Sequence, residues 1–449
     1  MRFSSVWARV LALLAGLVLL IAAFWMLTTA ADLVDDERIV GTLTEAQASG
    51  TWNTGEVVND FGYSVDRYTE CVAFTQGLGT APDVSTNLGQ SMADVHLAPD
   101  GCGNLEVLLQ RLADQQQVTG TPYFRYWHGY APLTRPLLAW TDVQTLRTIV
   151  AVLLVSAFCV FVAGLVRTAG VIAGIVFSIP LVMTTDLLSL PASATHSLTW
   201  TVILASAAAA LYATRRWGQW GAISVGLYAG ALFAFIDLLT NPPAALMMLL
   251  VAVLTVLCVE RAPLCDSIVV TVWAAIAWSF GYVVTWFAKW FISALEFGFA
   301  AVDSSIRGMI AFRISGSYGS VEHALGAATR ANWQQWLDTS ALVRPLIVAS
   351  LLASLLLISG GRWRVSKWPV WLSLYLLISA IPVFWYELLS NHSQIHAWFT
   401  YRSLGVSLAV VLTGAAVVSG AGTRRPSDVD GAVAADDSAP RTSSSAEVP

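Results

Sequence analysis

Charged residues are scarce in this chain. Lys and Arg together number 24 and Asp and Glu 29 among 449 residues, or 12% charged, which is about half the share usual in soluble domains. A soluble protein of this length needs a charged shell, so the shortage excludes an ordinary soluble fold. Basic runs interleaved with aromatics are lacking too, which excludes a nucleic-acid partner.

Several signatures of catalysis are also missing. The sequence has no His-Glu-x-x-His motif, no clustered cysteines and no glycine-rich phosphate loop. Cofactor-dependent and nucleotide-hydrolysing enzymes therefore have no support, and the cofactor is unknown.

Long apolar runs dominate instead. Apolar residues make up 56% of the chain and the mean hydropathy is +0.65. Windows of about 20 nearly uncharged residues match the thickness of a bilayer. They predict an all-α polytopic membrane protein with ten transmembrane helices, at residues 7–29, 146–166, 171–190, 198–213, 220–239, 243–259, 268–288, 342–358, 369–389 and 403–418.

Basic residues in the short connections indicate the orientation. All six positive sites fall on one side if every window crosses, and the positive-inside rule makes that side the cytoplasm. Both termini are then cytoplasmic, in a bacterial plasma membrane. The basic residues are Arg2, Arg9, Arg167, Arg215, Arg216, Arg261, Arg362, Arg364, Lys367, Arg424 and Arg425. Small residues near position 30 also allow a cleaved signal peptide, but the apolar run is long and favours an uncleaved anchor.

Six regions follow from this pattern. A first transmembrane helix (1–30) precedes an extracytoplasmic domain (31–145). Helices two to seven (146–288) lead to an extracytoplasmic interfacial loop (289–341), then helices eight to ten (342–418) and a disordered cytoplasmic tail (419–449). The loop, rich in Trp and Arg, is typical of a helix lying on the headgroups, or alternatively of a lid or lipid-phosphate contact.

The segment from residue 32 to residue 145 is acidic, with 15 Asp or Glu against 5 Arg and no Lys. Its Gly, Thr, Ser and Pro punctuation and short apolar runs predict a mixed α/β fold. Cys71 and Cys102 are its only cysteines, and an oxidising compartment favours a disulfide between them over two buried thiols.

Ionisable residues gather at one predicted membrane level, the outer ends of the helices. Because charge inside a bilayer is costly, such residues are functional candidates, although wet helix ends tolerate them singly. We predict a shared outer pocket, with Asp237, before a double proline, as its best acid. The others are Arg125, His128, Arg135, Asp186, His196, Glu387, His392, His396 and Arg402.

His392 and His396 are four residues apart, so on a helix they would share a face. With Glu387 as a third ligand they could hold a metal, but the polar residues around them favour a turn. The sequence does not settle on a metal site.

Four blocks carry a resemblance. Arg-Tyr-Trp-His-Gly-Tyr at 125–130, Asp-Leu-Leu-Thr at 237–240, Gly-Tyr-Val-Val-Thr-Trp at 281–286 and the stretch 391–402 resemble recurring blocks of an uncharacterised bacterial multi-span family. That resemblance implies the topology and an outer site, without a reaction. More loosely, the architecture resembles lipid-linked type C glycosyltransferases, whose acidic residue beyond the first helix would correspond to Asp35, Asp36 or Glu37.

The leading hypothesis is a cell-envelope transferase. It would move a sugar or similar group from a lipid-phosphate donor, such as a polyprenyl-phosphate-linked one, using Asp35, Asp36 or Asp237 as base and Arg125, Arg135 or Arg402 for the phosphate. A transporter or flippase, a non-enzymatic scaffold or sensor, and a metal-dependent lipid hydrolase are the alternatives. The partners are membrane lipid in each case, and the oligomeric state is unknown.

Overall fold

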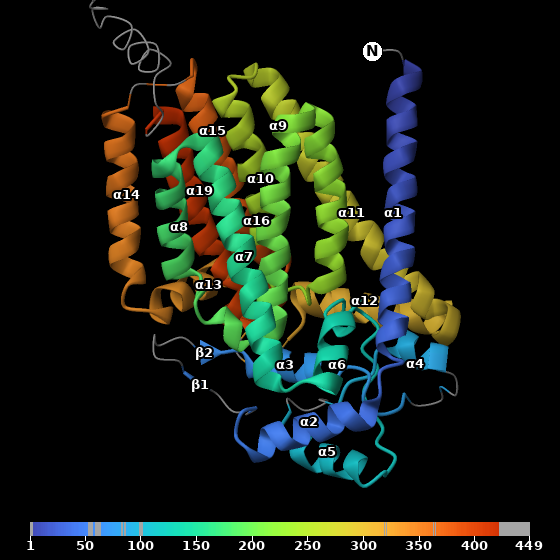
Figure 1. Cartoon of the computed structure of the whole chain (residues 1–449). Helices are drawn as coiled ribbons and strands as arrows, with labels where there is room; N and C mark the ends of the chain where they lie inside the picture. Colours follow the sequence, from blue (N-terminus) through green and yellow to red (C-terminus); the bar gives the residue numbers. More distant parts are fainter. Residues whose placement is uncertain are drawn as a thin grey trace, which may run out of the picture.

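The structure is a computed structural model, and it describes residues 3–52, 57–58, 64–81, 84, 87–97, 102–317, 319, 321–361, 363 and 365–421. Long helices form a bundle, and a smaller helical head lies at one end of it (Figure 1). The predicted disordered tail lies almost wholly outside the described residues.

The bundle contains the most apolar segments of the chain. Its helices are α1 (Phe3–Ala31), α7 (Val143–Ala169), α8 (Val171–Thr184), α9 (Ala194–Ile236), α10 (Pro242–Val259), α11 (Leu264–Phe297), α14 (Val343–Ser359), α15 (Trp368–Ser379) and α19 (Arg402–Ser419). Seven helices in the described part of the chain are long and apolar enough to cross a membrane, or eight if α14 and the helix before it form one bent span. The protein is therefore an all-α, multi-pass membrane protein, as the sequence predicted.

Two helices form the centre of the bundle. Nearly all of α10 and α19 is buried, whereas α1 and α14 expose large apolar side chains such as Leu19 and Leu356. Apolar side chains on an outward face are stable in lipid, so these outer helices face the bilayer.

Helix α9 contains two legs. Gly218 has non-helical dihedral angles, with φ +59°, a conformation that glycine adopts without strain. Thr199 on the first leg donates to Asp237, just after the second, over 3.3 Å. Residues 38 apart in sequence can meet in this way only because the chain doubles back at Gly218, and this reversal separates two of the predicted windows.

The head contains α2 (Asp36–Ala48), α3 (Arg67–Phe74), α4 (Asn87–Ala93), α5 (Leu105–Ala113) and α6 (Ala131–Trp140). The predicted disulfide between Cys71 and Cys102 is confirmed. Among the described residues, β1 (Val57–Val58) and β2 (Ser64–Val65) are the only strands, so this part of the head is mainly helical and the mixed α/β fold stays a prediction.

Short helices close the bundle at the head end. They are η1 (Leu190–Ala192), α12 (Phe299–Ser315), α13 (Ala327–Thr339), α17 (Ser390–Ile395) and α18 (Ala397–Thr400), whereas α16 (Ile381–Leu388) continues α15 as one apolar segment of the bundle, Trp368–Leu388. Helix α12 lies beside the head end of the bundle rather than along it (Figure 1).

Candidate functional site

Two cavities adjoin each other between the head and the bundle. The polar cavity has a volume of about 280 Å³, and its lining includes Tyr68, Thr69, Tyr123, Arg125, Thr240, Arg313, His392, His396, Trp398 and Phe399. The aromatic cavity has a volume of about 150 Å³ and is lined by Arg125, Tyr126, Leu239, Tyr282, Trp286, Trp290, Ile306, Met309, Ile310, Arg313, Trp385 and Leu389. Arg125 and Arg313 line both, so they stand at the boundary.

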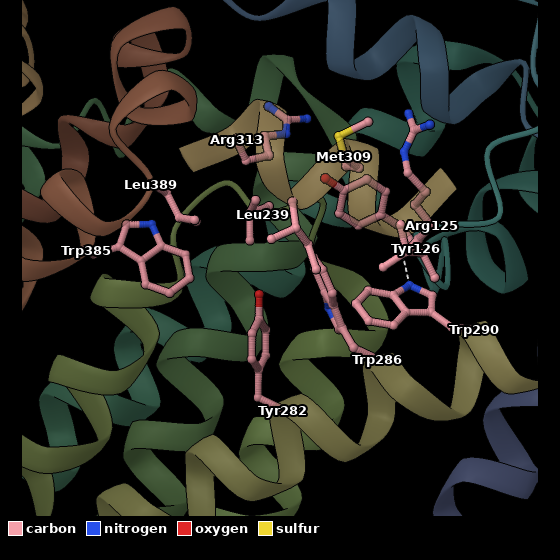
Figure 2. A pocket seen from close by; sticks show the side chains of 12 residues that line it. Arg125, Tyr126, Leu239, Tyr282, Trp286, Trp290, Met309, Arg313, Trp385 and Leu389 are labelled. Atoms are coloured by element: carbon pink, nitrogen blue, oxygen red, sulfur yellow. Dashed lines mark hydrogen bonds between the residues drawn. The ribbon is translucent and has the colours of Figure 1, made fainter. Parts of the chain in front are cut away.

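The aromatic cavity is lined by three helices, by Arg125 and Tyr126 from the loop before α6, and by Leu239 from the turn after α9. Helix α11 supplies Tyr282, Trp286 and Trp290 at successive four-residue steps, which place them on one face of the helix. Helix α12 and the end of α16 complete the walls. Figure 2 shows the guanidinium groups of Arg125 and Arg313 at the same end of this cavity.

Neither boundary arginine has a carboxylate partner in the described structure. The Nε atoms of Arg125 and Arg313 are buried without a hydrogen-bond acceptor. Arg125 lies over the Tyr123 ring, with 4.6 Å between the guanidinium carbon and the ring centroid, and Arg313 Nη1 donates to His392 Nδ1 over 2.5 Å. Two cations with unused donors beside an empty volume are suited to bind an anion such as phosphate.

Asp237 acts on this arrangement indirectly. Its carboxylate accepts hydrogen bonds from the backbone N–H of Thr240, at 2.7 Å, and from the Thr240 hydroxyl, which closes the turn after α9. Within that turn Leu239 has φ +67°, and its carbonyl accepts from His392 Nε2 at 2.9 Å. With Nε2 protonated, His392 Nδ1 is free to accept from Arg313, so Asp237 positions Arg313 through the turn.

Both histidines of the polar cavity are neutral. Burial and the charge of Arg313 lower the pKa of His392 well below its usual range and the pKa of His396 to about 3. His396 stacks on Phe399, with ring centroids 5.1 Å apart, and its Nδ1 has no hydrogen-bond partner. A pKa of about 3 makes the His396 imidazole a weak base at neutral pH.

Three other predicted site residues, Asp35, Asp36 and Arg135, lie where the end of α1 meets the head. Asp35 caps α2, and Asp36 accepts from Arg135 over 2.5 Å. The buried Arg135 guanidinium also donates to the carbonyls of Ala31, Gln76 and Val34, so it ties the end of α1 to the head. Neither acid lines the polar or the aromatic cavity.

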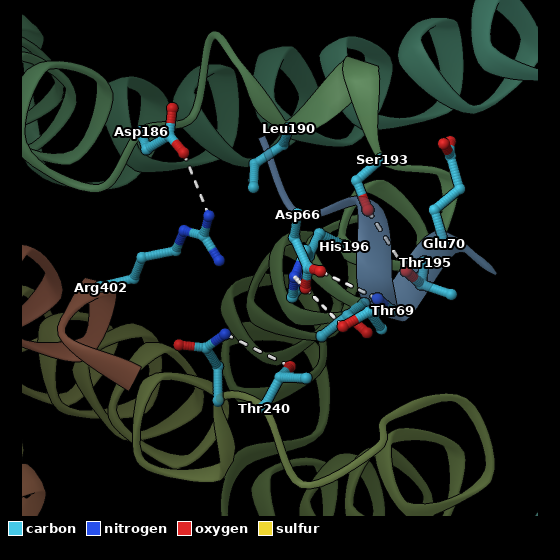
Figure 3. Close-up of polar contacts among 12 residues, drawn as sticks. Asp66, Thr69, Glu70, Asp186, Leu190, Ser193, Thr195, His196, Thr240 and Arg402 are labelled. Carbon is cyan, nitrogen blue, oxygen red and sulfur yellow. Dashed lines mark hydrogen bonds and ion pairs between the residues drawn. The ribbon is translucent and has the colours of Figure 1, made fainter. Parts of the chain in front are cut away.

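Two further pairs lie buried at the head end of the bundle. Arg402 donates to Asp186 over 3.0 Å, and His196 Nε2 is 2.6 Å from Asp66 (Figure 3). These pairs join segments far apart in the sequence, and the second joins α3 of the head to α9. Arg402 and Asp186 therefore pair with each other rather than facing either cavity.

Glu387 and His128 both form hydrogen bonds within the protein. Glu387 accepts from the backbone N–H groups of Gly326 and Thr329, at the start of α13. His128 contacts the Tyr130 hydroxyl and the Tyr123 carbonyl, which orders the loop before α6. Glu387 is thus turned toward α13, and the described residues include no group of three His, Cys, Asp or Glu suited to a metal.

Sequence reasoning gave no site role to Arg313 or Trp385, although both line the aromatic cavity. The signal for Arg313 was the Trp- and Arg-rich loop 289–341, which the sequence indicated as a helix on the headgroups or, alternatively, as a lid or a lipid-phosphate contact, whereas Trp385 lies in a predicted transmembrane window. Nothing in the sequence showed that this loop meets His392.

Comparisons with protein-family models, with curated proteins and with solved structures find no match for this chain. The two resemblances noted in the sequence stay predictions, and function has to be argued from the site.

Proposed function

We propose that the chain is a multi-pass protein of the bacterial plasma membrane with ten crossings, both termini in the cytoplasm and the head outside. Most predicted windows fall on one helix or on one leg of α9, whereas the window 369–389 covers α15 and α16 and the window 171–190 runs past the end of α8. Arg147 at the start of α7 contacts the head, so Arg167 lies at the far end, and Arg215 near the α9 reversal lies 4.0 Å from Glu260 after α10. Basic residues at that end favour a cytoplasmic side. Arg2, Arg362, Arg364, Arg424 and Arg425 lie outside the described residues.

On this topology, the two cavities lie at the outer leaflet and hold a lipid with a phosphate headgroup. Arg125 and Arg313, which lack any carboxylate partner among the described residues, are the observation that carries this proposal. Both side chains are half-buried, so a phosphate can reach them, and cations without a counter-charge favour an anionic ligand. The aromatic cavity beside the arginines would accept the lipid's apolar part.

The activity we propose is transfer of a sugar or similar group from that lipid phosphate to an acceptor hydroxyl. The hydroxyl oxygen would bond to the transferred group as the hydroxyl proton passes to an oxygen of the departing lipid phosphate. The lipid phosphate would leave with the bonding electron pair, and Arg125 and Arg313 would stabilise its charge. Asp237, one of the three acids that the sequence offers as the base, would position Arg313 instead.

A deletion strain tests the transfer. Its lipids and envelope glycans would be profiled after complementation with wild type, with Arg125→Gln/Arg313→Gln, or with Arg307→Gln, a control at an exposed ion pair. We expect a missing envelope component or an accumulated lipid-linked precursor, restored by wild type and by Arg307→Gln but not by the double variant. Full restoration by the double variant would refute the proposed function.

A further inference from the structure

The wall of the aromatic cavity contains polar hydrogens with no acceptor. Among the residues that the structure describes, the buried Tyr282 hydroxyl and the buried indole Nε1 atoms of Trp286 and Trp385 have no hydrogen-bond partner. All three residues line the cavity, and in Figure 2 the Tyr282 hydroxyl points toward Leu239, into the space below the two arginines. Tyr282 is only 9% exposed, so bulk water does not form a hydrogen bond with its hydroxyl.

Neighbouring indoles differ in this respect. Trp290 Nε1 donates to the Arg125 carbonyl over 3.2 Å, and Trp127 Nε1 donates to the Thr285 carbonyl over 2.7 Å. Buried donors are normally satisfied in this way, and each one left unsatisfied costs about 1–3 kcal/mol. Three unsatisfied donors around one cavity therefore point to acceptors on a ligand.

The chemistry of the ligand follows from what adjoins the donors. A polyprenyl phosphate carries its phosphate directly on a hydrocarbon, so a tail in this cavity would leave all three donors unsatisfied. A glycerophospholipid places two ester carbonyls between its phosphate and its acyl chains. Carbonyl oxygens are suitable acceptors for indole N–H and phenol O–H groups.

We propose that the lipid bound here is a glycerophospholipid, with its phosphate at Arg125 and Arg313 and its ester carbonyls accepting from Tyr282, Trp286 and Trp385. This inference rests on the proposed lipid-phosphate site, and it replaces the expected polyprenyl donor with an ester-linked one. It concerns binding alone, so it does not depend on which group is transferred.

An ester-to-ether comparison tests it on the full-length protein in neutral detergent. Affinities would be measured by native mass spectrometry for dioleoyl phosphatidic acid, its diether analogue, undecaprenyl phosphate, dioleoylglycerol and glycerol 3-phosphate. The ether analogue keeps the phosphate and the chains but lacks the carbonyls. We expect the ester lipid to bind about tenfold more tightly than the ether, since one or two hydrogen bonds are worth about that much. Undecaprenyl phosphate should bind no better than the ether, and glycerol 3-phosphate should not compete.

Tyr282→Phe removes a donor but keeps the ring. We expect it to weaken binding of the ester lipid about fivefold, the middle of the range for one hydrogen bond, and to leave binding of the ether unchanged. Trp385→Phe should act in the same direction, with Trp333→Phe, outside the cavity lining, as the matched control. Thermal unfolding of each variant shows whether it folds.

The outcomes distinguish failure of the glycerophospholipid inference from failure of the lipid-phosphate site. Equal affinity for ester and ether in wild type, or tighter binding of undecaprenyl phosphate, overturns this inference and leaves the lipid-phosphate site standing. If dioleoylglycerol binds as tightly as phosphatidic acid, the phosphate site itself is wrong.

Discussion

Arginines at the head end of this protein form two groups. Arg135, Arg147 and Arg402 are buried, and each donates to a carboxylate, Asp36, Glu70 or Asp186 respectively. Arg125 and Arg313 line the two cavities and donate to no carboxylate in the described structure. The paired arginines are buried and the other two are half-buried, so partner and exposure together separate structural arginines from candidate ligand-binding ones.

The difference has a physical basis. A buried arginine paired with a carboxylate has its charge compensated within the fold, and three such pairs hold the head to the bundle or close the bundle's end. An unpaired arginine keeps its charge available to a ligand at a cost in stability. Substitution of a paired arginine should therefore lower stability, and substitution of an unpaired arginine should lower ligand affinity.

Loss of a paired arginine should have the largest effect. Arg147→Met leaves the fully buried Glu70 without its arginine, so we expect the free energy of unfolding to fall by about 3–5 kcal/mol. Denaturant unfolding in detergent measures this. The control, Arg307→Met, breaks an exposed pair and should change stability by less than about 0.5 kcal/mol. A similarly small loss in Arg147→Met would contradict the structural role of the paired group.

Loss of an unpaired arginine should act on binding instead. Arg313→Gln removes a charged donor to phosphate, so we expect affinity for a phosphate-headed lipid to fall about 10- to 100-fold. The unfolding free energy should stay within about 1 kcal/mol of wild type, since no buried carboxylate loses its partner. A variant that unfolds readily but binds lipid normally would place Arg313 in the structural group.

Asp237→Asn sharpens the comparison, because Asp237 acts on Arg313 only through the turn. The amide weakens the hydrogen bonds from Thr240, so we expect a loss of about 1–2 kcal/mol in stability and a less than tenfold loss in transfer rate. A general base would give a 10²- to 10⁴-fold loss instead. A rate loss of that size in a folded variant would restore Asp237 as the base.

A lower pH should have the smallest of these effects, and it should act on the free energy of unfolding. The pKa of His396 is lowered to about 3, below the usual value of about 6.5, so the unfolded chain binds more protons than the folded one between these values. Stability is then constant above about pH 7 and falls as the pH drops. We expect a loss of about 1 kcal/mol by pH 5.5. His396→Gln should reduce this loss, and unfolding curves that coincide at every pH for variant and wild type would argue against a buried, neutral His396.

Much of the fold could be read from the sequence because lipid imposes long apolar runs. The candidate site could be read only in part. Arg125, His392 and His396 were predicted to share a pocket, and they line one cavity. Arg402 and Arg135 were given the same role, yet their partners are internal, and Asp186 is 216 residues from Arg402. Pairing over that distance depends on how helices pack, which local sequence does not encode.

The lipid retained by the purified protein tests the central claim most directly. Lipids extracted from wild type, from Arg125→Gln/Arg313→Gln and from Arg307→Gln would be identified by mass spectrometry and quantified per chain. We predict that wild type and Arg307→Gln retain a phosphate-headed lipid at a fixed stoichiometry, and that the folded double variant loses it. Equal retention by all three proteins would contradict a lipid-phosphate site at Arg125 and Arg313.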